Sequence, residues 1–200
     1  MADIIEPIGS TADDVITFSE SNGLSTAGAY VGGFLVCGRY NYANTRMNVG
    51  LRFPALAIDQ GQQIDLAEIK VYQHDYTGNG VATWFGHDVD DAPAWASTTN
   101  LPRNITRTSA SASVVAGTNG TVVAQDVTAI VQEILDRGGW TSGNDMAFLA
   151  SVSTATGTGN RGFFWHDFST PGGTPAVLEV TFPAAGGGGA MPLVDGGLVN

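Results

Sequence analysis

Residues 46–53, RMNVGLRF, decide the fold of this chain because their polarity repeats every two residues. Met47, Val49, Leu51 and Phe53 are apolar, whereas polar residues or glycine stand between them. Successive side chains of a β-strand point to opposite faces, so the pattern predicts a strand with one buried face. The same period recurs along the chain and predicts a protein built mostly of strands.

Further strands are expected on both sides of this stretch. Sequences rich in Gly and Asn, such as residues 77–80, TGNG, separate them and are typical of tight turns. The expected strands are residues 15–18, 30–37, 64–71, 81–85, 121–124, 146–152, 162–168 and 176–182.

One segment has the period of a helix. Its apolar residues recur at spacings of three and four and would form a single stripe. They are Val127, Ile130, Val131, Ile134 and Leu135. Asp126 or Thr128 can cap its start, and Gly138 follows its end. The whole pattern predicts an all-β protein: a two-sheet antiparallel β-sandwich, most simply a jelly roll, with one short amphipathic α-helix.

Composition narrows the classes of function. The 200 residues include 27 Gly, only 14% are charged, and the formal net charge is −11. An acidic chain repels the phosphates of nucleic acids and anionic lipids, so we expect neither nucleic-acid nor membrane binding. Cys37 is the single cysteine, which excludes an internal disulfide.

The chain divides into three zones. Residues 1–12 are expected to form an N-terminal arm, and residues 13–182 the folded domain. Residues 183–200 begin with a Gly-rich linker and end in an apolar peptide. This C-terminal arm is predicted either to fray or to dock on a neighbouring subunit. Its partner-binding residues would be Met191, Leu193, Val194, Leu198 and Val199.

The folded zone resembles a known family. Residues 46–54 and 64–72 are similar to the R-x-L-L-R-F … I-x-x-A-x-L-x-L opening of DNRLRE-type domains. Residues 126–134, DVTAIVQEI, resemble the family's DVT-x-x-V helix. Residues 140–148 and 175–182 resemble its W-x-x-G-x-x-x-A-L segment and its closing strand. The resemblance implies a jelly roll like those of carbohydrate-binding modules, and its motifs are structural rather than catalytic.

Two groups of residues offer metal-binding chemistry. Asp88, Asp90 and Asp91 gather oxygen ligands in one loop, where they could hold a structural calcium ion or simply be solvated. His74, His87 and His166 are each followed by Asp. Adjacent strand residues point to opposite faces, so a metal site would need the histidines to meet across strands. We therefore expect no cofactor, with calcium as the one alternative.

Aromatic residues offer a second type of site. Tyr40 and Tyr42 lie in a polar loop and, with Trp95, are the candidate glycan contacts. The alternative is that the aromatic residues belong to the core and its rim.

No nucleophile motif, zinc-protease motif or phosphate loop occurs in the sequence, so an enzyme is not expected. The start of the chain lacks the features of a signal peptide. We expect synthesis in a host cytoplasm followed by incorporation into a bacteriophage virion. The predicted function is that of a structural protein, a capsid decoration or tail-appendage subunit that contacts other virion proteins and copies of itself. A carbohydrate-binding module that recognises surface glycans is the alternative.

Overall fold

A computed structural model describes residues 3–10, 12–18, 34–39, 46–77, 80–95, 102–155, 161–166 and 172–184. Within these ranges the chain forms strands, one α-helix and a short 3-10 helix, η2 (Pro102–Asn104). The strands are β1 (Ile4–Pro7), β2 (Asp14–Phe18), β3 (Phe34–Arg39), β4 (Arg46–Phe53), β5 (Leu66–Thr77), β6 (Gly80–His87), β7 (Arg107–Ser113), β8 (Thr121–Asp126), β9 (Met146–Ala155), β10 (Arg161–His166) and β11 (Val177–Thr181). The helix is α1 (Thr128–Leu135).

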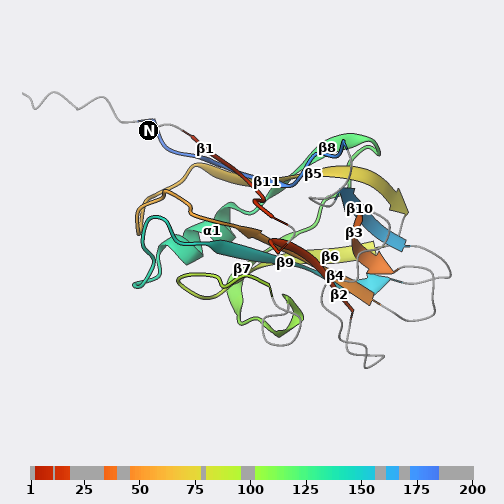
Figure 1. Ribbon diagram of the computed structural model, residues 1–200, viewed down its shortest axis with the longest axis horizontal. Coiled ribbons are helices and arrows are strands. Elements are labelled where there is room, and N and C mark those ends of the chain that lie inside the picture. Colours follow the sequence, from red (N-terminus) through yellow and green to blue (C-terminus); the bar gives the residue numbers. More distant parts are fainter. Residues whose placement is uncertain are drawn as a thin grey trace, which may run out of the picture.

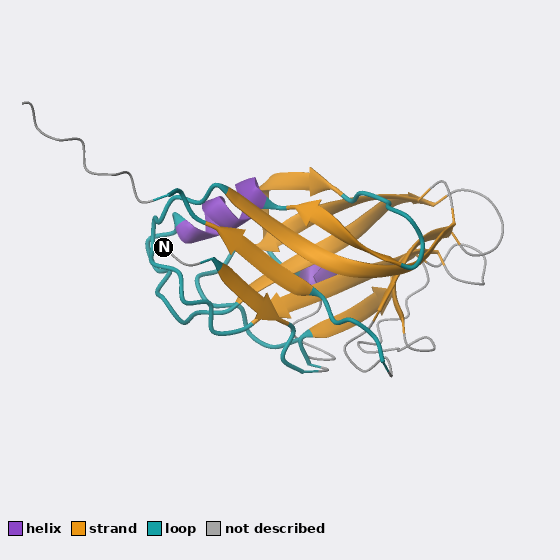
Figure 2. Cartoon of the chain, turned by 90° about the horizontal axis from the view of Figure 1, so that it is seen from above, coloured by secondary structure: helices purple, strands orange, loops and turns teal. Residues whose placement is uncertain are grey.

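The strands form one continuous antiparallel sheet that curls into two layers (Figures 1 and 2). In the first layer, β5 pairs with β8 on one side and with β11 and β10 on the other, and β1 and β3 lie beyond these. The second layer has the order β2-β4-β9-β6-β7. A short pairing of β3 with β4 joins the layers. The all-β sandwich with one short helix is therefore confirmed.

The core lies between the two layers. Trp84 of β6 and Trp165 of β10 belong to opposite layers and stack with ring centroids 5.4 Å apart. Both indoles are fully buried, as are Phe53 and Phe148, which meet edge to face at 5.8 Å. The alternating apolar residues of β4 point inward, as their spacing predicts.

Helix α1 closes one end of the sandwich, between the layers at the left of Figure 1. Its predicted stripe is buried, from Ile130 to Leu135. Asp126 stabilises the start, because its Oδ1 accepts the Thr128 N–H at 2.9 Å. Trp140 follows the helix, is fully buried and donates its indole N–H to the Ile58 carbonyl at 2.8 Å.

Two strands were not predicted. β7 has the sequence RTSASAS, which lacks large apolar residues at alternate positions. β1 lies within residues 1–12, which were expected to form an arm, and it pairs with β11 from Ile4 opposite Val180 to Pro7 opposite Val177. Cross-strand pairing of this kind depends on distant sequence, so the local pattern does not reveal it.

Candidate functional site

The predicted glycan contacts are not brought together. Trp95 is only 7% exposed and packs in a small cluster with Ile105 and Leu149. Its ring cannot stack on a sugar without leaving that cluster, so the prediction of Trp95 as a glycan contact is wrong. Tyr40 and Tyr42 lie outside the described residues. The predicted arm residues Met191, Leu193, Val194, Leu198 and Val199 also lie outside them.

The acidic loop has protein partners. Arg137, just after α1, pairs with Asp88 and donates its Nε–H to Asp90 at 2.7 Å. The hydrogen bond to Asp90 is the main cause of a raised pKa for Arg137. Asp91 accepts the Asp145 N–H at 2.9 Å. A calcium ion at Asp88, Asp90 and Asp91 would have to displace this guanidinium, so the structure favours an arginine-bridged loop over a calcium loop.

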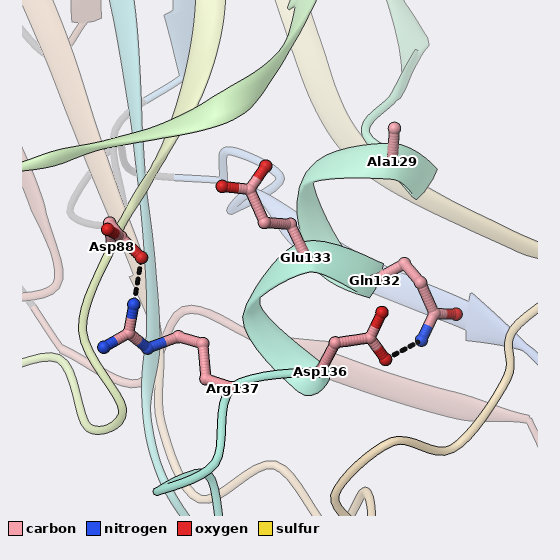
Figure 3. Close-up of a pocket in the computed structure, with 6 residues that line it drawn as sticks. All are labelled: Asp88, Ala129, Gln132, Glu133, Asp136 and Arg137. Atoms are coloured by element: carbon pink, nitrogen blue, oxygen red, sulfur yellow. Dashed lines mark hydrogen bonds and ion pairs between the residues drawn. The ribbon is translucent and has the colours of Figure 1, made fainter.

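A shallow pocket lies between this loop and the exposed face of α1 (Figure 3). Arg137 reaches across it to Asp88, whereas Gln132 and Asp136 bond to each other on the helix surface. Glu133 projects from the helix toward β7, where its carboxylate accepts the N–H groups of Ser109 and Ala110. Each charged side chain that lines the pocket thus bonds to a neighbouring group of the protein.

The most distinctive surface feature is a row of four rings and one aliphatic side chain on the outer face of the first layer. It consists of Phe34, Tyr72, His74, His166 and Val122, here named the outer stripe. Tyr72 stacks on His166 with centroids 4.1 Å apart, and Phe34 stacks on His74 at 4.2 Å. The registers place His166 opposite Phe34, and Tyr72 opposite Val122. The outer stripe therefore crosses four neighbouring strands, β8, β5, β10 and β3.

The outer stripe is accessible. His74 is exposed, Val122 is 51% exposed, and the other three side chains are partly exposed. Its neighbours Val71 and Gln73 on β5 are buried, which confirms that Tyr72 and His74 point away from the core. A row of aromatic and aliphatic side chains that crosses four strands on the outside of a sandwich has the character of a contact surface.

The two histidines of the outer stripe lie close together. Their ring centroids are 6.1 Å apart, and His166 Nδ1 accepts the Thr174 N–H at 3.2 Å. Burial, and then the proximity of His74, lower the pKa of His166. The lowered pKa favours the neutral form of His166, whose ring presents an apolar face with polar edges.

From the sequence, a metal site required the three histidines to meet across strands, and the structure brings His74 and His166 together. The alternation along β5 could have put Tyr72 and His74 on one face, but the cross-strand neighbours Phe34 and Val122 carry no local signal. His87 is buried on another strand, so the three histidines do not gather. Within the described part of the chain, no group of three or more His, Cys, Asp or Glu side chains is placed to hold a metal ion.

Cys37 is not placed for nucleophilic chemistry. Its side chain is fully buried, and this burial raises the pKa of the thiol. Its Sγ contacts the Ala150 carbonyl at 3.5 Å. The lone cysteine thus has the role of a small apolar core residue.

No protein-family model matches this chain, and no curated protein is similar to it. The resemblance to DNRLRE-type domains therefore stays a prediction from sequence. No helix in the described ranges is long and apolar enough to cross a membrane.

Proposed function

We propose that this chain is a non-enzymatic structural protein of a virion, either a capsid decoration subunit or part of a tail appendage. It binds neighbouring virion proteins, including its own copies, through the sandwich surface and its terminal segments. The observation that carries this proposal is the outer stripe. Aromatic side chains at partly exposed positions are the usual anchors of protein contacts, because they bury much apolar area at little cost in side-chain entropy.

The surroundings of the outer stripe support a contact role. Further along the same face, Lys70 lies between Glu68 and Glu179 and is paired with both. Lys70 thus offsets one of the two carboxylate charges beside the outer stripe, which reduces the charge that a partner would have to cover. On β1, at the edge of the same layer, Ile5 adds a side chain that is 63% exposed.

The test is co-sedimentation of the full chain with purified virion particles. The double variant Tyr72→Ser and Val122→Ser is expected to abolish particle binding while the urea midpoint of the chain stays close to that of the wild type. Val81→Ser is the matched control, because Val81 is 55% exposed on β6 in the other layer. Removal of residues 183–200 tests the terminal segment separately. A full chain that does not bind the particles would refute the proposal. Unchanged binding by the double variant and by the truncated chain would refute the outer stripe and the terminal segment as its contact surfaces.

A carbohydrate-binding module is the second candidate, and the outer stripe also favours it. Aromatic faces beside polar imidazole edges suit the apolar faces and hydroxyls of a neutral sugar. A glycan array separates the two candidates. Specific binding that is lost in Tyr72→Ser would favour the glycan, whereas particle binding without glycan binding would favour assembly.

A further inference from the structure

The free edge of β7 carries a second, independent feature. β7 ends the strand order of the second layer and, among the strands that the structure describes, pairs only with β6. The Val114 N–H donates to the Ala82 carbonyl of β6 at 2.9 Å. Hydrogen-bonded residues alternate in an antiparallel ladder, so Ala112, opposite Trp84, also points its backbone groups at β6. The backbone groups of Ser111 and Ser113 must therefore point outward.

Both ends of this edge are capped by side chains. The Glu133 carboxylate of α1 accepts the N–H groups of Ser109 at 2.8 Å and Ala110 at 2.6 Å. At the other end, the Gln125 amide bonds to the N–H and the carbonyl of Val115, each at 2.7 Å. The two caps leave an interval, Ser111 to Ser113, that we name the β7 window.

Neither serine of the β7 window has an outward hydrogen-bond partner among the residues that the structure describes. The window opens into a groove of about 590 Å³ between β7 and the start of α1. Ser111, Ala112 and Ser113 form one wall, and Val127 and Ala129 lie on the other. These small side chains leave room for another chain beside the strand.

We propose that the β7 window binds an extended segment of a partner protein, which adds a strand to the sheet and carries a basic side chain. Each outward serine offers one N–H and one carbonyl, the groups that a β-strand bonds when it joins a sheet edge. Asp126 is the charged residue that lines the groove, Glu133 stands at its end, and no Lys or Arg among the described residues lines it. This charge favours a basic segment.

A second copy of this chain fits less well. Edge-to-edge pairing of two β7 strands would bring together the Glu133 and Asp126 carboxylates of two chains that each carry a net charge of −11. The proposal rests on the assembly role proposed above, since it identifies one surface by which such a subunit would hold a neighbour.

The orientation of β7 is tested by proline substitution. Ser111→Pro removes only an outward N–H, and proline is tolerated in an edge strand when its N–H would face solvent. We expect its urea midpoint to match that of the wild type. Ala112→Pro, the matched control, removes an N–H that bonds to β6 and should lower the midpoint clearly. Equal destabilisation by both variants would overturn the assignment of the outward groups.

The occupant is tested by selecting random displayed peptides on the full chain. Enriched peptides are expected to be rich in β-branched residues, to carry Lys or Arg, and to protect the Ser111 and Ser113 amides from hydrogen exchange. Loss of a backbone hydrogen bond together with the bulk of the proline ring should weaken their binding to Ser111→Pro at least about tenfold. Failure to enrich any peptide, or equal binding to wild type and Ser111→Pro, would overturn the proposal.

Three further outcomes are informative: the first identifies the occupant, and the other two separate this proposal from the assembly role. A wild-type dimer that Ser111→Pro converts to monomers would show that a second copy fills the β7 window, and would overturn the choice of occupant. Particle binding that survives in Ser111→Pro while peptide selection fails would refute the β7 window and leave the assembly role standing. Peptide selection that succeeds while the outer-stripe and truncated variants still bind particles would refute only the outer stripe and the terminal segment.

Discussion

The side-chain amide of Gln125 pairs with both backbone groups of Val115, its Oε1 accepting the N–H and its Nε2 donating to the carbonyl, each at 2.7 Å. Gln125 is fully buried, and its Oε1 also accepts the indole N–H of Trp84 at 3.3 Å. Gln73 repeats the arrangement at Gly117, with bonds of 2.8 and 3.2 Å. Two buried glutamines thus take the place of a strand ladder where the chain crosses from β7 to β8.

Replacing Gln125 with Met should lower the free energy of unfolding by about 3 kcal/mol, because the volume is kept while the Val115 and Trp84 groups lose their partner. Urea denaturation measures the change. Gln60→Met is the control, since Gln60 is exposed and its side chain donates to the Arg137 carbonyl. It should cost less than about 0.5 kcal/mol. Equal effects of the two substitutions would show that Gln125 does not hold the crossover.

The sequence was sufficient to predict the elements in which apolar residues recur at a regular spacing, such as β4 and α1. Their apolar spacing is a local consequence of facing the core. The outer stripe and the β7 window could not be predicted in this way, because both depend on which strands become neighbours. His166 next to Phe34, or Gln125 next to Val115, requires the register of the whole sandwich. Trp95 was misjudged since composition does not tell a buried indole from an exposed one.

Arg52 should contribute far more to stability than Lys70. Arg52 pairs with Asp13 and Asp145 and donates to the Ala92 carbonyl at 2.9 Å, with only 15% of its side chain exposed. Arg52→Met would leave Asp13, whose side chain is 5% exposed, without its cation, at a cost of about 3 kcal/mol. Lys70 is 36% exposed, so Lys70→Met should cost less than about 1 kcal/mol. Similar losses in urea denaturation would contradict this ranking.

Stability should fall as the pH drops below the pKa of an ordinary histidine. Burial lowers the pKa of His87, with Asp88 opposing and Arg137 assisting, and burial also lowers the pKa of His166. The unfolded chain therefore takes up these protons first, so stability is full above about pH 6.5 and is lost as the pH falls from there. One proton taken up on unfolding changes the stability by at most about 1.4 kcal/mol per pH unit, and the partly exposed His166 should contribute less than the buried His87.

The measurement is the urea midpoint between about pH 7.5 and pH 5.5, a range above most carboxyl titrations. His166→Gln should flatten the dependence, because it removes one of the two proton-linked groups and cannot become charged beside His74. A slope as steep as that of the wild type would show that His166 does not contribute to it.

Gly162 should tolerate no side chain. Its φ is +125°, a backbone conformation that residues with a Cβ rarely adopt, and it pairs with Gly38 where β10 lies against β3. A Cβ at this position would lie 2.4 Å from the Cys37 carbonyl oxygen and 2.7 Å from Gly38 Cα. Both atoms belong to the backbone, so relief requires β3 and β10 to separate. We expect Gly162→Ala to lower the free energy of unfolding by about 3 kcal/mol.

Gly138→Ala is the matched control, because nothing lies within 4 Å of its added Cβ. It should change the stability by less than about 0.5 kcal/mol. The two strands that Gly162 holds together carry Phe34 and His166 at the opposite end of their pairing. Gly162→Ala should therefore also weaken any binding by the outer stripe, whereas Gly138→Ala should leave it intact. A Gly162→Ala variant with wild-type stability and binding would mean that the close approach of β3 and β10 does not support the outer stripe.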